Sequence, residues 1–196
     1  MGKMFWFDTE TTGTDPERHD IVSLGAIVQI DGNIECECEF SMFPFAPENA
    51  EAMALEVNGL TMEEINGYPD PRQAHKDLLL LLGRFVDKFN PKDKMVPCGF
   101  VTHFDVAMLR AFFRKCGDKY YGSWFTSCSY DVMSTIAALV GQDRIPTLRD
   151  YRLSTILNHF EIDNPRAHSA MNDIRSTLML DQALRTYGGM VHAAPA

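Results

Sequence analysis

The chain has 196 residues, of which 45% are apolar and 23% are charged. These fractions are typical of a single globular domain, and they exclude an intrinsically disordered chain and a collagen-like or coiled-coil one. The longest leucine run, residues 78–82, is too short to cross a membrane, and Asp8 comes too early for a secretory signal. We therefore expect a cytoplasmic protein without a membrane span.

The formal net charge of −9 argues against a passive nucleic-acid coat, because such proteins carry basic patches. Five cysteines without a C-x-x-C pair predict neither a disulfide framework nor a zinc ribbon. Cys36 and Cys38 alternate with Glu35, Glu37 and Glu39. In a strand the two thiols would share one face, and we expect them to pack in the core.

Strands are predicted for the first part of the chain. The apolar run 4–7, which ends at an acid, is typical of a central strand buried on both faces. Alternating apolar residues over 21–30 predict a strand with one face more buried than the other. Asp31 and Gly32 suit a tight hairpin turn, which makes 34–43 the returning strand.

Strands and helices alternate in the rest of the chain. The remaining predicted strands are 95–98 and 127–130, and the predicted helices are 73–89, 106 to about 117, 131–140, 148–160 and 169–187. Strands first and alternation afterwards predict an α/β fold with a mixed central sheet flanked by helices. We expect one domain over 1–188 and a flexible C-terminal tail over 189–196.

Two carboxylates stand two residues apart in Asp8-Thr9-Glu10, at the end of the first predicted strand. The two-residue period of a strand points both to one side, which is costly unless a cation neutralises them. Oxygen ligands suit a hard ion such as Mg²⁺ or Mn²⁺. A bare D-x-E is frequent by chance, however, and alone it favours a solvated strand end with a turn at Gly13.

The longer string Phe-Asp-Thr-Glu-Thr-Thr-Gly over 7–13 resembles the first motif of the DEDDh (DnaQ-like) family of 3′–5′ exonucleases, which have an RNase H-like fold. Phe104-Asp105 resembles the second motif, an Asp that opens a helix after the fourth strand. His168, five positions before Asp173, resembles the third. Ser169 stands where a tyrosine-type member would have Tyr.

The resemblance implies five catalytic residues, namely Asp8, Glu10, Asp105, His168 and Asp173. The four acids are then the metal ligands of two divalent cations, Mg²⁺ or Mn²⁺, and His168 is the general base. Five helical residues turn by about 500°, so His168 and Asp173 cannot share a face of one helix. We expect His168 on a mobile entry loop.

Weaker similarities suggest how substrate is held. The segment 57–61 resembles the part of the family that touches the substrate end. The predicted substrate-binding residues are Thr9, Thr11, Thr12, Asn58, Leu60 and Phe104. Asn58 stands where the family usually has His, and Gly99-Phe100-Val101 where many members have Gly-His-Asn, so the substrate preference stays open.

Other basic and aromatic residues near the motifs have two interpretations. The basic residues are Arg110, Arg114, Lys115, Arg149, Arg152 and Arg166, and the aromatic ones are Phe45, Phe100 and Phe104. They could line a phosphate path or stack on bases, but solvated helix faces and core packing are the commoner roles.

The resemblance predicts a metal-dependent 3′–5′ exonuclease that releases nucleoside 5′-monophosphates from the 3′ end of nucleic acid, with single-stranded DNA slightly favoured over RNA. One alternative is an RNA-trimming exoribonuclease. Another is a catalytically silent exonuclease-like binding module in a replication or repair complex, which the intact set of five residues argues against. The expected partners are a nucleic-acid 3′ end and a polymerase or repair complex; the oligomeric state stays open.

Overall fold

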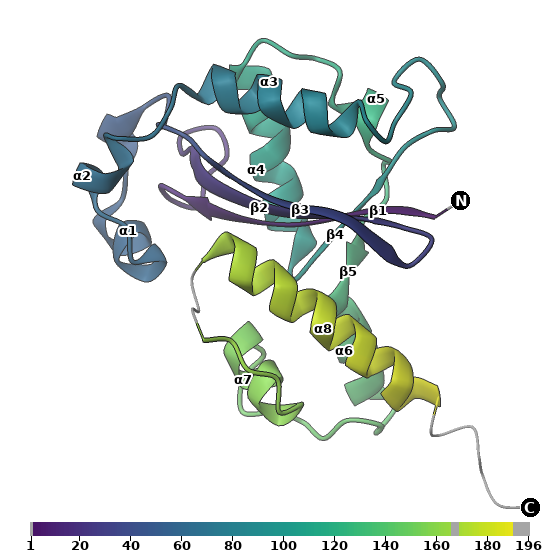
Figure 1. Ribbon diagram of the computed structural model, residues 1–196. Helices are drawn as coiled ribbons and strands as arrows, with labels where there is room; N and C mark the ends of the chain where they lie inside the picture. Colours follow the sequence, from purple (N-terminus) through teal and green to yellow (C-terminus); the bar gives the residue numbers. More distant parts are fainter. Residues whose placement is uncertain (1, 166–168, 190–196) are drawn as a thin grey trace, which may run out of the picture.

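A five-stranded mixed sheet forms the centre of the computed structural model, which describes residues 2–165 and 169–189, with side chains up to residue 185 (Figure 1). The strands are β1 (Lys3–Thr11), β2 (Ile21–Ile30), β3 (Asn33–Ser41), β4 (Val96–Gly99) and β5 (Tyr130–Asp131), in the order β3-β2-β1-β4-β5. β1, β2 and β3 pair antiparallel, whereas β4 runs parallel to both β1 and β5. The predicted α/β fold with a mixed sheet is confirmed.

Helices cover both faces of the sheet (Figure 1). The helices are α1 (Ala52–Asn58), α2 (Met62–Ile65), α3 (Pro71–Leu82), α4 (Thr102–Lys115), α5 (Tyr121–Trp124), α6 (Val132–Gly141), α7 (Leu153–His159) and α8 (Ala170–Gly189), with a 3₁₀ turn at Pro47–Asn49. One buried cluster joins the sheet to α3, α4 and α5, and a second joins it to α6, α7 and α8. None of the described helices is long and apolar enough to cross a membrane.

The central strands contribute to both clusters. In β1 the fully buried Phe5 and Phe7 pack toward α3 and α4, while Trp6 between them packs toward α6 and α8. β2 is also buried on both faces along nearly all its length. The expectation that one face of this strand is more buried than the other is therefore wrong. Ile27 packs beneath α8, and Gly25 lets the start of α8 approach the sheet closely.

Several helix ends differ from the predicted ones because side chains cap the neighbouring backbone. α3 ends at Leu82 rather than at residue 89, and the following turns are held by bonds such as Phe89 N–H to Asp87 Oδ1 (3.0 Å). Phe89 is 85% exposed instead of buried on a helix face. α7 begins at Leu153 rather than at residue 148, because Asp150 accepts bonds from the Arg152 N–H and the Thr155 hydroxyl.

Smaller differences affect the sheet and the chain end. β5 covers residues 130–131 instead of 127–130, since residues 126–128 form a turn in which Thr126 Oγ1 donates to Cys128 O. Cys36 and Cys38 are half-buried against the α3 side of the sheet, on the face predicted for them. Residues 190–196, most of the predicted tail, lie outside the described part of the chain. The division into a domain over 1–188 and a tail stays a prediction.

Candidate active site

Three of the predicted catalytic acids lie together at the carboxyl end of β1. Asp8, Glu10 and Asp173 each offer a carboxylate oxygen, and these atoms lie within 4.8 Å of one another. Asp8 and Glu10 point to one side of the strand, as their spacing predicted, and Asp173 stands in the first turn of α8. The carboxylates of Asp8 and Glu10 thus lie next to that of Asp173, which comes from a helix distant in sequence.

Gly25 explains why α8 can lie so close to these acids. It pairs with Asp8 across the β1–β2 ladder. A Cβ atom at Gly25 would lie 2.5 Å from the backbone of Ala170 and Met171, a distance that no real Cβ contact shows. The missing side chain therefore admits the first turn of α8 directly onto β2 and sets the position of Asp173.

Asp105 reaches the same region from α4, on the other side of β1. Thr9 points to that side, and both its backbone N–H (3.0 Å) and its hydroxyl (2.7 Å) donate to Asp105 Oδ1. The side chains of Asp8, Thr9 and Glu10 therefore alternate between the two faces of the strand and bring the second motif to the first.

The turn between β4 and α4 is held in an unusual backbone conformation. Val101, immediately before α4, has φ 57° and ψ 44°, the left-handed region that a β-branched residue rarely adopts. Its N–H donates to Asp131 Oδ1 (3.1 Å) at the start of α6. Gly99 is also required, because a Cβ there would lie 2.8 Å from Phe7 O. This strained turn sets where α4, and with it Asp105, begins.

Burial and mutual repulsion shift the ionisation of the site. Burial is the main cause that raises the pKa of Glu10 to about 7, with the charges of Asp173 and Asp105 adding to it. Burial likewise raises the pKa of Asp105 to about 7, against the lowering effect of the two bonds from Thr9. The pKa of Asp8 lies well above its ordinary value, through burial and then repulsion from Asp105, Glu10 and Asp173. Three carboxyl groups that resist ionisation alone, with the carboxylate of Asp173 beside Asp8 and Glu10, fit a hard divalent cation.

The predicted substrate-binding residues divide into two groups. Asn58 and Leu60 line a hollow of about 110 Å³ beside Glu10, and Asn58 Nδ2 donates to Thr11 O (2.9 Å). The other wall residues of this hollow are Ser23, Glu39, Ser41, Tyr68, Ser169 and Ala170. Thr9 is already bonded to Asp105. The hollow therefore brings the 57–61 segment next to Glu10.

The remaining predicted binding residues face inward in this structure. Thr12 is fully buried, and its hydroxyl accepts a bond from the Asp20 N–H (2.9 Å). The Thr11 hydroxyl donates to Gly13 O (2.8 Å). Phe104 is half-buried and packs against the core cluster on the α3 side. Thr11 and Thr12 therefore shape the turn after β1, and any contact of theirs with substrate stays a prediction.

His168 lies outside the described residues, so the structure does not locate the predicted general base. Asn164, on the preceding loop, donates from Nδ2 to Asp173 Oδ1 (2.6 Å) and orients that carboxylate. Sequence reasoning missed Asn164, because it stands nine residues before Asp173 and belongs to no motif.

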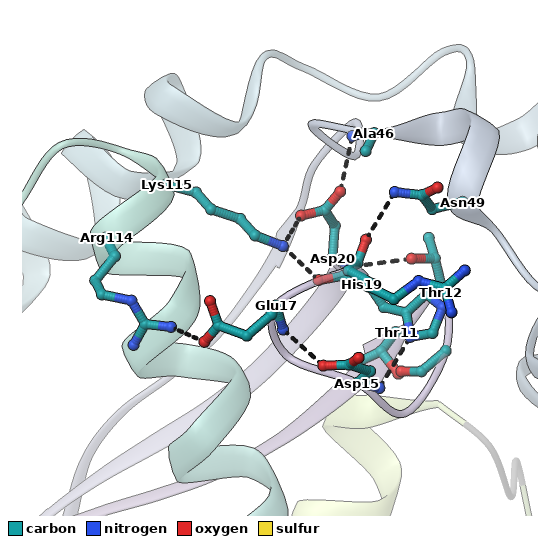
Figure 2. A network of polar contacts seen from close by, with 12 residues as sticks. Thr11, Thr12, Asp15, Glu17, His19, Asp20, Ala46, Asn49, Arg114 and Lys115 are labelled. Atoms are coloured by element: carbon teal, nitrogen blue, oxygen red, sulfur yellow. Dashed lines mark hydrogen bonds and ion pairs between the residues drawn. The ribbon is translucent and has the colours of Figure 1, made fainter.

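A network of polar contacts fixes the loop between β1 and β2 (Figure 2). The buried ring of His19 lies under Gly13 and accepts a bond at Nδ1 from the Asp15 N–H (2.9 Å). Lys115 Nζ, at the end of α4, reaches His19 O (2.6 Å) and Asp20 Oδ1 (2.8 Å). These contacts tie the turn that follows the acids to the end of the helix that carries Asp105.

Most basic residues considered for a phosphate path are engaged elsewhere. Arg114 pairs with Glu17, Lys115 with Asp20, and Arg149 with Asp150. The Arg110 guanidinium lies 4.4 Å from the centre of the Tyr121 ring. Arg152 is the N-cap residue of α7, and Arg166 lies outside the described residues. Arg110, Arg114, Lys115 and Arg149 thus form surface pairs and packing contacts, whereas the roles of Arg152 and Arg166 stay predictions.

The sequence profile of the exonuclease family matches residues 5–180. The chain belongs to the exonuclease family. Among curated members it is 26% identical over 174 residues to a PolC-type DNA polymerase III of Halalkalibacterium halodurans and 25% identical over 174 residues to that of Oceanobacillus iheyensis. The matches cover 87% of this chain but only 10% of either polymerase, so this exonuclease-family chain corresponds to a small part of those relatives.

Solved structures show that the family fold is shared. Escherichia coli exonuclease I in complex with an oligonucleotide superposes with a TM-score of 0.82 at 19% identity, over 98% of this chain and 43% of that one. A zinc-bound complex of the same enzyme with single-stranded DNA gives a TM-score of 0.81 at 18% identity, over 95% and 41%. The predicted RNase H-like fold is therefore confirmed.

Proposed function

We propose that this chain is a divalent-metal-dependent exonuclease that removes nucleoside 5′-monophosphates from the 3′ end of single-stranded nucleic acid, with DNA favoured over RNA. The observation that carries the proposal is the convergence of Asp8, Glu10 and Asp173 within 4.8 Å, with Asp105 bonded to the residue between the first two. Membership of the exonuclease family supports the reaction class.

The acids are assigned as ligands of two cations. Asp8, Glu10 and Asp173 would hold the first, and Asp8 would share the second, with Asp105 as a ligand through water. When bound there, Mg²⁺ or Mn²⁺ would supply charge stabilisation for the attacking and departing oxygens of an in-line displacement at phosphorus. The raised pKa values of Glu10 and Asp105 support this assignment, because carboxylates that resist ionisation alone become stable anions beside a cation.

The remaining groups position the substrate and move the proton. Asn58 and Leu60 form a wall of the small hollow beside Glu10, so the 57–61 segment would contact the terminal nucleotide next to the acids. His168 accepts the proton of the attacking water, and its exchange for alanine should slow hydrolysis about 10²- to 10⁴-fold, with partial recovery at high pH. The oligonucleotide complexes of exonuclease I support a single-stranded DNA substrate here.

The proposal leaves two alternative functions, and it includes a polymerase or repair complex as the partner. An RNA-trimming enzyme would use the same acids and differ only in its contacts to the sugar. A silent binding module would have no reason to keep Glu10, Asp105 and Asp173, whose charges raise the pKa of Asp8. Similarity to PolC-type polymerases favours work beside a polymerase or repair complex.

The test is the digestion of 3′- and 5′-labelled oligonucleotides, DNA and RNA, single- and double-stranded, with Mg²⁺, with Mn²⁺ or with a chelator. A 3′ label should appear at once as mononucleotide, and a 5′ label should pass through a ladder of shortening products. Asp8→Asn should lower the rate by several orders of magnitude, and without metal its melting temperature should not fall, because repulsion is relieved.

The matched control is Asp77→Asn, an exposed acid on α3 that accepts a bond from Gln73. It should keep full activity. The two-metal assignment is wrong if Asp8→Asn retains more than about a tenth of the wild-type rate, a loss below roughly 1.4 kcal/mol. Binding without hydrolysis under every metal condition would instead support the silent module.

A further inference from the structure

An apolar groove lies where the end of α3 meets α5. Figure 1 shows both elements near the end of the sheet where β1 begins, away from the carboxyl end of β1 that carries the acids. Two adjoining hollows of about 350 and 400 Å³ share Leu79, Lys88 and Trp124. Trp124 O accepts a bond from the Met95 N–H just before β4, and β4 pairs with the start of β1, whereas Asp8 and Glu10 stand near the other end of β1.

The groove exposes more apolar surface than the fold requires. Among the described residues, seven large apolar side chains are about half exposed or more, and three of them surround this groove: Leu80 (72%), Phe89 (85%) and Tyr120 (71%). In the leucine run of α3, Leu78 and Leu82 are buried in the core, but Leu80 points away from it. Core packing therefore does not explain why leucine stands at residue 80.

The rim of the groove is basic, although the chain as a whole is acidic. Ten of the eighteen lysines and arginines lie between residues 71 and 128, against five aspartates, while the whole chain carries −9. Lys76 and Lys88 line the groove, and Lys119 precedes the exposed Tyr120. None of these three lysines forms an ion pair with another described residue. Asp118, which also lines it, lies 3.2 Å from His75 Nε2.

Lys88 is held in place between two aromatic rings. Its ammonium lies 5.2 Å from the centre of the Phe89 ring and 5.9 Å from that of Trp124. A cation fixed over an apolar hollow offers a partner both a charge and a contact surface, which is how a short peptide with an apolar anchor and acidic neighbours would be held.

We propose that this groove docks an acidic peptide segment of a partner protein, with a leucine or phenylalanine side chain in the hollow and carboxylates against Lys76, Lys88 and Lys119. A second copy of the chain fits less well, because a two-fold contact would bring Lys88 against the same lysine of its mate. Nucleobases fit less well too, since the aliphatic and aromatic wall leaves their polar edges unpaired.

The probes are fluorescein-labelled octapeptides of aspartate and glutamate with two apolar positions. The reference peptide has leucine at one of these positions and phenylalanine at the other, and the rest of the panel varies each position over leucine, phenylalanine and tryptophan. Anisotropy should show saturable binding with a Kd of about 100 μM or tighter, weakening as salt is added. Peptides with lysine for every acid, or serine for both apolar residues, should not bind.

Variants of the groove locate the binding. Phe89→Ser and Lys88→Glu should each raise the Kd at least tenfold, or about 1.4 kcal/mol. Two matched controls lie elsewhere: Met179→Ser, half exposed on α8, and Lys94→Glu, which lines a different hollow. Both should change the Kd less than twofold. Thermal unfolding checks that each variant is folded, and the nuclease assay on the same samples keeps this test separate from the proposed function.

Three results would overturn the proposal. The first is that no peptide of the panel binds, or that the controls weaken binding as much as the groove variants. The second is that a nuclease-resistant single-stranded oligonucleotide displaces the peptide, which would make the groove a nucleic-acid surface. The third is a dimer, seen by sedimentation of the wild type, that Phe89→Ser abolishes.

Discussion

At the scale of single residues, the strained turn before α4 departs from what the family pattern suggests. Many members of the resembled family have Asn where this chain has Val101, and the backbone there is left-handed. Asn tolerates that conformation because its short polar side chain bonds locally, whereas a β-branched side chain clashes with the following carbonyl. The backbone requirement is thus intact although the residue differs.

Val101→Asn should therefore stabilise the protein by about 1 kcal/mol without lowering nuclease activity. Urea unfolding in the presence of Mg²⁺ measures the change. Val101→Ile, which keeps the branched Cβ, is the control and should gain nothing. A loss of stability in Val101→Asn would mean that packing of the valine methyl groups outweighs the strain.

Deprotonation of Glu10 should make the metal-free protein less stable as the pH rises. The pKa of Glu10 is raised from 4.5 to about 7, so between these values the folded chain holds a proton that the unfolded chain has released. The folded state therefore loses stability through this window, by up to about 3 kcal/mol from this group. Below about pH 4.5 both states are protonated and the effect vanishes.

Thermal unfolding in chelator from pH 5 to 8 measures this effect. Glu10→Gln should match the wild type near pH 5 and melt higher than the wild type near pH 8, while added Mg²⁺ should stabilise only the wild type strongly. Glu63→Gln, in an exposed turn of α2, should follow the wild-type curve. Parallel curves for Glu10→Gln and the wild type would show that Glu10 ionises normally in the fold.

At the scale of elements, the contact of α8 with β2 decides where the third motif stands. Gly25→Ala would force the backbone of Ala170 away from the sheet, at a cost of about 1–3 kcal/mol. Because Asp173 moves with α8, the rate should fall about 10²-fold or more even where the variant is fully folded.

Gly141→Ala is the matched control, since a Cβ at Gly141 meets nothing within 4 Å. It should keep both stability and rate. Denaturant unfolding and single-turnover rates measured on the same samples separate the two effects. A Gly25→Ala variant with the wild-type rate would show that α8 can shift without displacing the acids.

The same scale shows what could be predicted from the sequence. Local patterns predicted β1, the β2–β3 hairpin and the pairing of Asp8 with Glu10, because strand periodicity and turn chemistry are short-range. The end of α3 was missed because the helical spacing of apolar residues continues as far as Phe89. The side chain of Asp87 instead accepts a backbone hydrogen bond and holds this segment in turns. Asn164 and His19 could not be predicted, since their roles depend on tertiary neighbours alone.

At the scale of the whole molecule, charge is distributed unevenly. Ten of the eighteen lysines and arginines lie in residues 71–128. Two of them, Arg114 and Lys115, are paired with Glu17 and Asp20 in the loop that follows the first motif. Little positive charge is therefore left to offset four carboxylates where a phosphodiester must bind. Repulsion between two such charges at 4 Å is roughly 4 kcal/mol at an effective dielectric constant near 20.

Metal should therefore control substrate binding as well as hydrolysis. Affinity for a single-stranded oligonucleotide should be at least about tenfold higher with Ca²⁺, which suits carboxylate ligands, than with chelator at the same ionic strength. Asp8→Asn should show a smaller difference between the two conditions. Equal affinity of the wild type with and without Ca²⁺ would point to a basic groove that binds nucleic acid independently of the acids.

The docking of α8 onto Gly25 also has a consequence for how the protein is made. The acids at residues 8 and 173 belong to opposite ends of the described chain, so their meeting is a contact of very high sequence separation, which forms late and slowly. A ribosome-bound chain that stops before Ala170 has both strand carboxylates but leaves Trp6 and Ile27 without the helix that covers them. Such an intermediate exposes apolar surface and lacks Asp173, so a growing chain should gain the proposed nuclease activity only after α8 has left the exit tunnel.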